Sequence, residues 1–163
     1  MAIRNIVKKG DEILRKKCKP VTEFNEKLWA ILDDMRETLI NANGAGLAAP
    51  QVGIMRRYAL IRLLEDVDKD HEDEAEIVEM INPVIIKKSG RQRDIEGCLS
   101  CPNVFGYVKR PKKCVVRFQD RNGNTVERAF TGLGCRAACH ETDHLDGVLF
   151  VDLVDEYVDP DED

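Results

Sequence analysis

The sequence lacks any long apolar run. Across its 163 residues no apolar stretch approaches the roughly 20 residues that a helix needs to cross a bilayer. Residues 1–10 also hold no apolar stretch long enough for a secretory signal. We therefore expect a cytoplasmic protein that does not associate with a membrane.

An excess of basic charge is missing too, because the formal net charge is -5. Binding to the phosphate backbone depends on clustered Lys and Arg, so we expect no direct DNA binding. The chain contains neither an internal repeat nor a linker, and its length suits one hydrophobic core. We interpret residues 1–163 as a single domain whose acidic end, from about 154 to 163, is frayed.

Six cysteines are present, enough in principle for three disulfides. Thiols in the cytosol stay reduced, so cysteines close to histidines there indicate metal binding or catalysis instead. We expect most of the six to be buried thiols that pack as small hydrophobic residues.

Helices and strands are predicted in no regular alternation, which favours an α+β fold of antiparallel or mixed sheets around a central helix. The segment 44–51 is too rich in Gly and Pro to be regular, and the acidic run 65–76 reads as an exposed loop. We expect helices at about 25–43 and 131–145, a short helical segment after 11, strands at 57–63, 77–81 and 84–87, and a hairpin of 114–119 with 125–130.

The second of these helices carries His140-Glu-Thr-Asp-His144. Residues four apart lie on one face of a helix with Cβ atoms about 5–6 Å apart, so both imidazoles can bind one metal ion. Glu141 lies beside that face and can act as acid/base on a metal-bound water. The spacing therefore predicts a metal-dependent hydrolase.

A catalytic site of this kind needs a third protein ligand and one open position. A histidine six residues after His144 is excluded because that position is Phe150, and Asp155 and Glu156 in the short tail are weak candidates. Upstream, Cys98 and Cys101 offer thiolates. They could also close a structural site with both histidines, although 38 residues separate Cys101 from His140, where about 12–15 are usual.

Three segments together resemble motifs of the bacterial peptide deformylase family. They are Gly44-Ala-Gly-Leu-Ala-Ala-Pro-Gln51, Glu96-Gly-Cys-Leu-Ser100 and His140-Glu-Thr-Asp-His-Leu-Asp-Gly147, in the family's order and at matching separations. The resemblance implies that Cys98, His140 and His144 hold one divalent metal ion. By the same resemblance, Glu141 is the acid/base, while the amide of Gln51 and the backbone N–H of Leu99 stabilise the oxyanion.

The resemblance also implies the reaction, which is removal of the formyl group from the formylmethionine of new polypeptides with release of formate. Ferrous iron is the implied metal, and zinc, nickel and cobalt are alternatives. We expect a monomer that acts on nascent chains. The sequence does not decide whether the protein contacts the ribosome. Two other hypotheses remain: a hydrolase of free formylated amino acids or of other amides on the same scaffold, and a non-enzymatic module stabilised by zinc.

Glycines and a few departures from the family pattern bear on the substrate pocket. Gly44, Gly46 and Gly97 lack side chains where a peptide backbone must approach closely. Ala45 is smaller than the family's usual Val or Ile, which implies a wider methionine pocket. Further departures are Thr142, Cys139 and the pair Gly134-Cys135. By resemblance, Glu96 pairs with Arg110 and anchors the cysteine loop.

Overall fold

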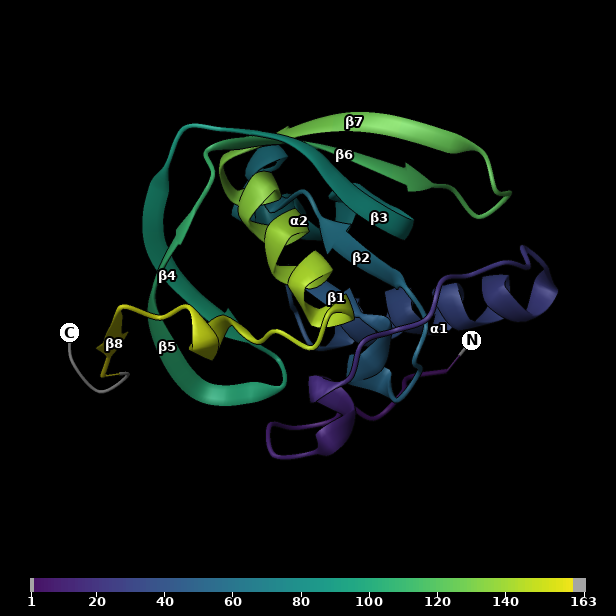
Figure 1. Ribbon diagram of the computed structural model, residues 1–163, viewed down its shortest axis with the longest axis horizontal. Helices are drawn as coiled ribbons and strands as arrows, with labels where there is room; N and C mark the ends of the chain where they lie inside the picture. The colour runs from purple at the N-terminus through teal and green to yellow at the C-terminus, as the bar shows by residue number, and fades with distance from the viewer. Residues whose placement is uncertain (1, 160–163) are drawn as a thin grey trace.

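The computed structural model describes residues 2–159. Within these residues, two antiparallel sheets and two α-helices make up the fold, with strand orders β1-β2-β3-β6-β7 and β4-β5-β8 (Figure 1). The helices and strands are α1 (Glu26–Asn41), β1 (Gly46–Ala48), β2 (Tyr58–Arg62), β3 (Ile77–Ser89), β4 (Gln92–Cys98), β5 (Cys101–Arg110), β6 (Lys113–Gln119), β7 (Thr125–Thr131), α2 (Gly132–Leu145) and β8 (Glu156–Val158). The predicted α+β class is confirmed.

Helix α2 lies in the middle of the molecule and packs on the five-stranded sheet, while β4 and β5 curve past its other side (Figure 1). Gly132 opens the helix with a φ of +54°, and the Glu65 carboxylate accepts the backbone N–H of Leu133 at 3.1 Å. The helix ends before Gly147, whose φ is +76° and where a Cβ would lie 2.5 Å from the carbonyl oxygen of Arg15. A glycine is therefore required at this stop.

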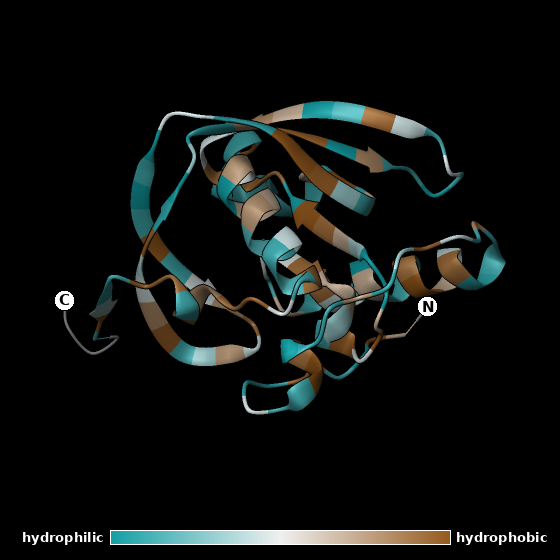
Figure 2. Cartoon of the chain, viewed as in Figure 1, coloured by the Kyte–Doolittle hydropathy of each residue, from teal (hydrophilic) through white to brown (hydrophobic). Residues whose placement is uncertain are grey.

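The first helix covers another part of the core. Its N-cap is Asn25, whose side chain accepts the N–H of Leu28 at 3.2 Å. The buried side of α1 packs against strands β2 and β3. Figure 2 shows hydrophobic residues along α1 and through these two strands. The hydrophobic residues on that buried side are Leu28, Leu32, Met35 and Leu39. None of the helices formed by residues 2–159 combines the length and apolar character that a bilayer-spanning helix requires.

Segment 44–51 is more regular than expected. Residues 46–48 form strand β1, antiparallel to β2, and Ala49–Val52 form a turn of 3-10 helix, η2. The prediction of irregular structure was wrong because the pairing of β1 depends on β2, a partner that local composition does not reveal. The side chain of Arg62 donates to the carbonyl of Gly44 at 3.2 Å and holds the start of the segment.

The two strands expected at 77–81 and 84–87 are one strand with a bulge. Asn82 has a φ of +51°, and its amide bonds both to the backbone of Val21 and to the side chain of Gln119. Pro83 falls at this irregularity, where its missing N–H interrupts no regular pairing. Strands β4 and β5 were not predicted.

Part of the acidic segment expected to form a frayed tail, residues 156–158, is a strand. Strand β8 pairs with β5, and Asp155 and Glu156 form ion pairs with Arg93 at 2.7 and 3.1 Å. Both carboxylates are therefore engaged away from the histidines, and they are not metal ligands. Residues 160–163 lie outside the described part.

Candidate metal centre and active site

His140 and His144 lie on adjacent turns of α2, with ring centroids 5.1 Å apart. Cys98 ends β4, and its Sγ is 3.4 Å from Nε2 of His144. One ligand atom from each of the three residues lies within 4.8 Å of the other two. Cys101, although it is paired with Cys98 across the turn between β4 and β5, does not join this group. The geometry therefore favours three ligands over the closed site of four.

The donor set fits a divalent metal ion. Two imidazoles and one thiolate suit iron, zinc, nickel and cobalt, and three protein ligands leave a position open. Burial lowers the pKa of His144 well below its ordinary value, which keeps its imidazole neutral and able to bind a metal. Oε1 of Glu141, which lines the cavity beside these ligands, is buried without a hydrogen-bond partner among the described side chains.

Glu96 fixes the orientation of the first histidine. Its Oε1 accepts from Nδ1 of His140 at 2.9 Å, so the other ring nitrogen, Nε2, is left for a metal. Burial by itself would raise the pKa of Glu96, but hydrogen bonds from His140 and Arg110 outweigh it and hold that pKa far below its usual range. The carboxylate therefore stays ionised in the interior.

Two arginines complete this buried network. Arg110 donates to both oxygens of Glu96 at 2.9 and 3.0 Å, as the resemblance implied, and also to Asp143 at 2.6 Å. Arg136 donates to Glu96 at 2.5 Å. The sequence did not indicate the roles of Arg136 and Asp143. Their positions on the same helix as the histidines, four residues before His140 and one before His144, were the only available signal.

Glu141 is 4% exposed, and burial raises its pKa to about 7. Its Oε2 lies 3.9 Å from Nε2 of His140. Strand β1 passes directly against this carboxylate, since a Cβ added to Gly46 would lie 2.8 Å from both Cγ and Cδ of Glu141. A glycine is therefore needed at position 46 to leave room for the acid/base candidate.

Gln51 reaches the centre from η2. Its Oε1 accepts the backbone N–H of Ala48 at 2.9 Å, and its Nε2 donates to Oγ of Ser100 at 3.0 Å. The same Nε2 is 3.5 Å from Sγ of Cys98. The acceptor side of the amide is thus fixed by the backbone, and the donor side faces the cysteine loop.

A cavity of about 450 Å³ opens beside these groups and brings the predicted substrate residues together. A Cβ on Gly44 would lie 2.8 Å from Cδ1 of Leu99, and one on Gly97 would lie 2.8 Å from the ring of Phe105. The groups that lie close to Gly44 and Gly97 are thus side chains of the protein, where the sequence predicted the backbone of a peptide substrate. The lining includes Gly44, Ala45, Gly46, Gln51, Gly97, Cys98, Leu99, His140 and Glu141.

Departures from the family pattern on α2 are accommodated inside the protein. The hydroxyl of Thr142 donates to the carbonyl of Ala138 at 2.7 Å. This hydrogen bond satisfies the hydroxyl at a position where the family usually has an apolar residue. Cys139 and Cys135 are both buried and face the sheet core rather than the cavity. The departures on α2 do not line the cavity, whereas Ala45, the departure in segment 44–51, does.

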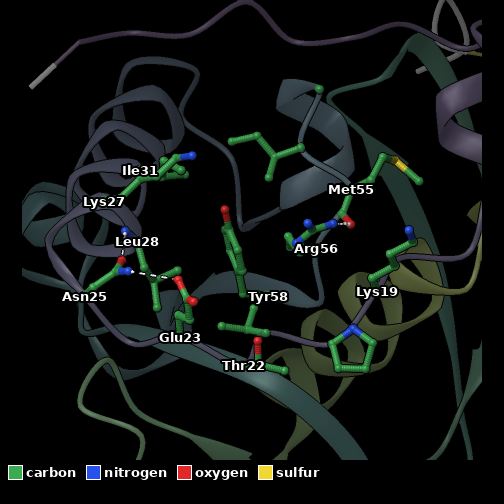
Figure 3. Close-up of a pocket in the computed structure, with 14 residues that line it drawn as sticks. Lys19, Thr22, Glu23, Asn25, Lys27, Leu28, Ile31, Met55, Arg56 and Tyr58 are labelled. Carbon is green, nitrogen blue, oxygen red and sulfur yellow. Dashed lines mark hydrogen bonds between the residues drawn. The ribbon is translucent and has the colours of Figure 1, made fainter.

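A larger depression, of about 640 Å³, lies between α1 and the segment after η2. Tyr58 stands at its centre, with Lys27 and Ile31 on one side and Met55 and Arg56 on the other (Figure 3). Its lining contains no His or Cys. The volume of a cavity therefore does not identify the active site in this protein. The positions of the metal-ligand side chains do.

The comparisons with known proteins agree with this site. Residues 3–159 match the family model described as polypeptide deformylase. A peptide deformylase of Caldanaerobacter subterraneus is 51% identical over 162 residues, which cover 99% of this chain and 96% of the relative. The crystal structure of peptide deformylase from Thermotoga maritima superposes with a TM-score of 0.85 at 38% identity, over 94% of this chain and 99% of that one.

A second solved structure is the Met-Ala-Ser-bound class I type b peptide deformylase from Acinetobacter baumannii. It is 33% identical, with a TM-score of 0.84, over 93% of this chain and 98% of that one. The match of sequence and fold extends over nearly the whole chain. The chain belongs to the polypeptide deformylase family, and its activity is the metal-dependent removal of the N-terminal formyl group from polypeptides.

Proposed function

We propose that this chain, as one catalytic domain, deformylates nascent polypeptides that begin with formylmethionine, using ferrous iron held by Cys98, His140 and His144. The observation that carries the proposal is the convergence of these three ligands on the cavity that also contains Glu141 and Gln51. The assignment of iron rests on the family resemblance. Because such chains are made in the cytoplasm, we place the protein there.

The chemistry follows from the positions of the side chains. A divalent ion held by Cys98, His140 and His144 would supply Lewis-acid activation of the water and of the formyl group. A carboxylate oxygen of Glu141 accepts the proton that the attacking water loses. The same carboxyl group then delivers that proton to the amine nitrogen as the C–N bond breaks, so that formate and a free N-terminus are released.

Gln51 and Leu99 act on the developing negative charge. The Nε2 of Gln51 and the backbone N–H of Leu99 are the proposed donors to the formyl oxygen. Gln51 is held in place by Ala48 and Ser100, so its amide is preorganised before substrate binds. Glu96 is a positioning residue that acts through His140.

The cavity determines the proposed substrate. Its approximately 450 Å³ exceed what one methionine side chain needs, which favours a peptide over a free formylated amino acid. The relative from Acinetobacter baumannii was solved with Met-Ala-Ser bound, which supports a peptide with N-terminal methionine as the product here. Gly44, Ala45, Gly46 and Gly97 form the proposed walls.

Formate release from formyl-Met-Ala-Ser tests the function. The protein is prepared without oxygen and reconstituted separately with iron, nickel or cobalt. Acetyl-Met-Ala-Ser and free formylmethionine serve as controls, and we expect rapid turnover of the formylated peptide alone. Absence of formate with all three metals would contradict the proposal. Faster turnover of free formylmethionine would favour the alternative hydrolase, and metal analysis of protein prepared without added metal would identify the native ion.

The protein is expected to behave as a monomer without RNA affinity of its own. The acidic run 65–76 and the net charge of -5 disfavour contact with phosphates. Salt-sensitive binding of the isolated protein to ribosomal RNA would overturn this expectation.

Replacement of Gln51 by Glu tests the oxyanion donor. The new carboxylate can still accept from Ala48, but it cannot donate to the formyl oxygen. We expect kcat to fall by about 10²–10³-fold. The metal content should not change, and steady-state kinetics on the nickel form would measure the loss. A rate within threefold of the parent would remove Gln51 from the mechanism.

Gly46→Ala tests the close approach of β1 to the acid/base. Because the added methyl would overlap Glu141, we expect a fall of about tenfold or more in kcat and a loss of about 1–3 kcal/mol in unfolding free energy. Gly134→Ala is the matched control. Its Cβ would meet Leu63 only at 3.4 Å, and alanine favours the helix, so rate and stability should be kept. Equal effects of both substitutions would contradict the explanation.

A further inference from the structure

Three cysteines outside the active site converge in the core beneath α2. Cys135 and Cys139 lie one turn apart on that helix, and Cys114 faces them from β6. Their sulfur atoms lie within 4.8 Å of one another. Sγ of Cys135 also donates to the carbonyl of Pro111 at 3.2 Å. The deformylase reaction uses none of these three residues.

The surroundings of this trithiol cluster are apolar. All three side chains are at most 4% exposed, and they pack with residues such as Val116 and Phe130 in one core cluster. Within residues 2–159, no His, Asp, Glu or further Cys joins the three sulfurs as a fourth donor. An ion in this position would therefore have three sulfur ligands and no fourth ligand from a His, Cys, Asp or Glu side chain of these residues.

The spacing suits a small thiophilic ion. Bonds of about 2.3 Å to sulfur, as in zinc thiolates, place the three sulfurs of a trigonal site about 4 Å apart. A pyramidal ion holds its sulfurs closer than this, so the present separations, at most 4.8 Å, would need to close by about 1 Å or more as the ion binds. Soft sulfur donors select soft ions over magnesium or calcium.

Charge decides which soft ion fits. Zinc with three thiolates carries a net charge of -1 and seeks a fourth ligand, and a buried uncompensated charge is costly. Arg110 and Arg136 act electrostatically on Cys135, but both are already paired with Glu96. A trivalent ion with three thiolates is neutral and needs no fourth donor.

We propose that Cys114, Cys135 and Cys139 form a binding site for a soft trivalent ion of the arsenic(III) class, separate from the catalytic metal. Arsenous acid exchanges its three As–O bonds for three As–S bonds. Each thiol proton leaves with one hydroxide as water, so three water molecules are released and the oxidation state of arsenic does not change. No oxidant or reductant is needed.

One edge of the cluster lies beside a surface depression at β6. Cys114 also lines a surface depression of about 250 Å³, together with Lys87, Lys113 and Ala129. Arsenous acid is uncharged at neutral pH, so these lysines do not oppose its entry. Local opening between β6 and α2 would then expose the sulfurs.

The test uses the nickel-loaded holoprotein carrying Cys101→Ser, because Cys98 and Cys101 form a competing dithiol. We expect arsenite to bind with one arsenic per chain, a mass gain of one arsenic less three hydrogens, and the loss of three free thiols. X-ray absorption at the arsenic edge should show three sulfur neighbours and no oxygen. This measurement needs no cluster variant, so it stands even where a variant fails to fold.

Variants then assign the sulfurs. Cys139→Ala should weaken arsenic binding by at least tenfold and reduce the sulfur neighbours to two. Cys18→Ala is the control, since Cys18 is an equally buried thiol in a different part of the core, and binding should be unchanged. No uptake by the Cys101→Ser protein, oxygen among the arsenic neighbours, uptake unaffected by Cys139→Ala, or preferential binding of zinc at the cluster would each overturn the proposal.

Discussion

Glu141→Gln is expected to lower kcat/KM for formyl-Met-Ala-Ser by about 10²–10⁴-fold while one metal ion per chain is kept. Glutamine matches glutamate in shape but cannot accept the proton of the attacking water. The side chain does not belong to the three-ligand group, so metal content should not change. Formate release and elemental analysis of the same samples separate the two effects.

A surface glutamate provides the control for this substitution. Glu127 is half exposed in an ion pair with Arg117, and Glu127→Gln should leave turnover at the parental rate. If Glu141→Gln retained full activity with metal bound, another group would have to be the acid/base. Loss of the metal would instead assign Glu141 a structural role.

The pH dependence of the parental enzyme follows from the same residue. The acid/base must begin as a carboxylate, and burial raises its pKa to about 7 in the absence of a metal. The positive charge of a bound ion favours the ionised form, so the midpoint should lie at or below that value. We expect kcat/KM to fall as the pH drops through this midpoint, and the residual rate of Glu141→Gln should lack this step.

Glu96→Ala should give the largest loss of stability. The carboxylate compensates Arg110 and Arg136, all three side chains being at most 5% exposed. Its removal leaves buried positive charge and is expected to cost about 3–5 kcal/mol in unfolding free energy. His140 also loses its orienting partner, and metal affinity should fall about 10–100-fold. Urea unfolding of the metal-free protein and a metal-competition titration measure the two quantities.

The linkage to pH gives this prediction a second readout. The pKa of Glu96 is lowered on folding, so its stabilisation is complete above the unfolded value of about 4.3 and is lost as the pH falls toward the folded value. The difference between the parent and Glu96→Ala should therefore shrink in acid. Glu127→Ala should cost no more than about 1 kcal/mol at any pH. A constant difference across the pH range would argue for a packing defect instead.

The sequence alone predicted the features that depend on local spacing. His140 and His144 share a face because they are four apart, and the helix that carries them begins and ends within one residue of the expected positions. The hairpin of β6 and β7 was likewise marked by its turn residues. In each case the residues that indicate the element lie inside the element itself, within about fifteen residues of one another.

The rest of the site depends on contacts between distant segments. Gln51 and Cys98 are 47 positions apart, and no periodicity could bring them within 3.5 Å. Their placement in one site came from the resemblance of three motifs. Arg136 was missed because its buried partner, Glu96, lies on a strand that the sequence did not predict. Glycine at positions 97 and 106 and proline at 102 obscured β4 and β5.

Helix α2 carries two pairs of donors at the same spacing, Cys135 with Cys139 and His140 with His144. The two pairs are offset by five positions along the helix, and each residue turns the helix by about 100°. Deleting or inserting a single residue before Cys135 would therefore rotate every donor away from its partner strand. Over this stretch, the two groups of donors therefore fix the length of the chain as well as the identities of the side chains.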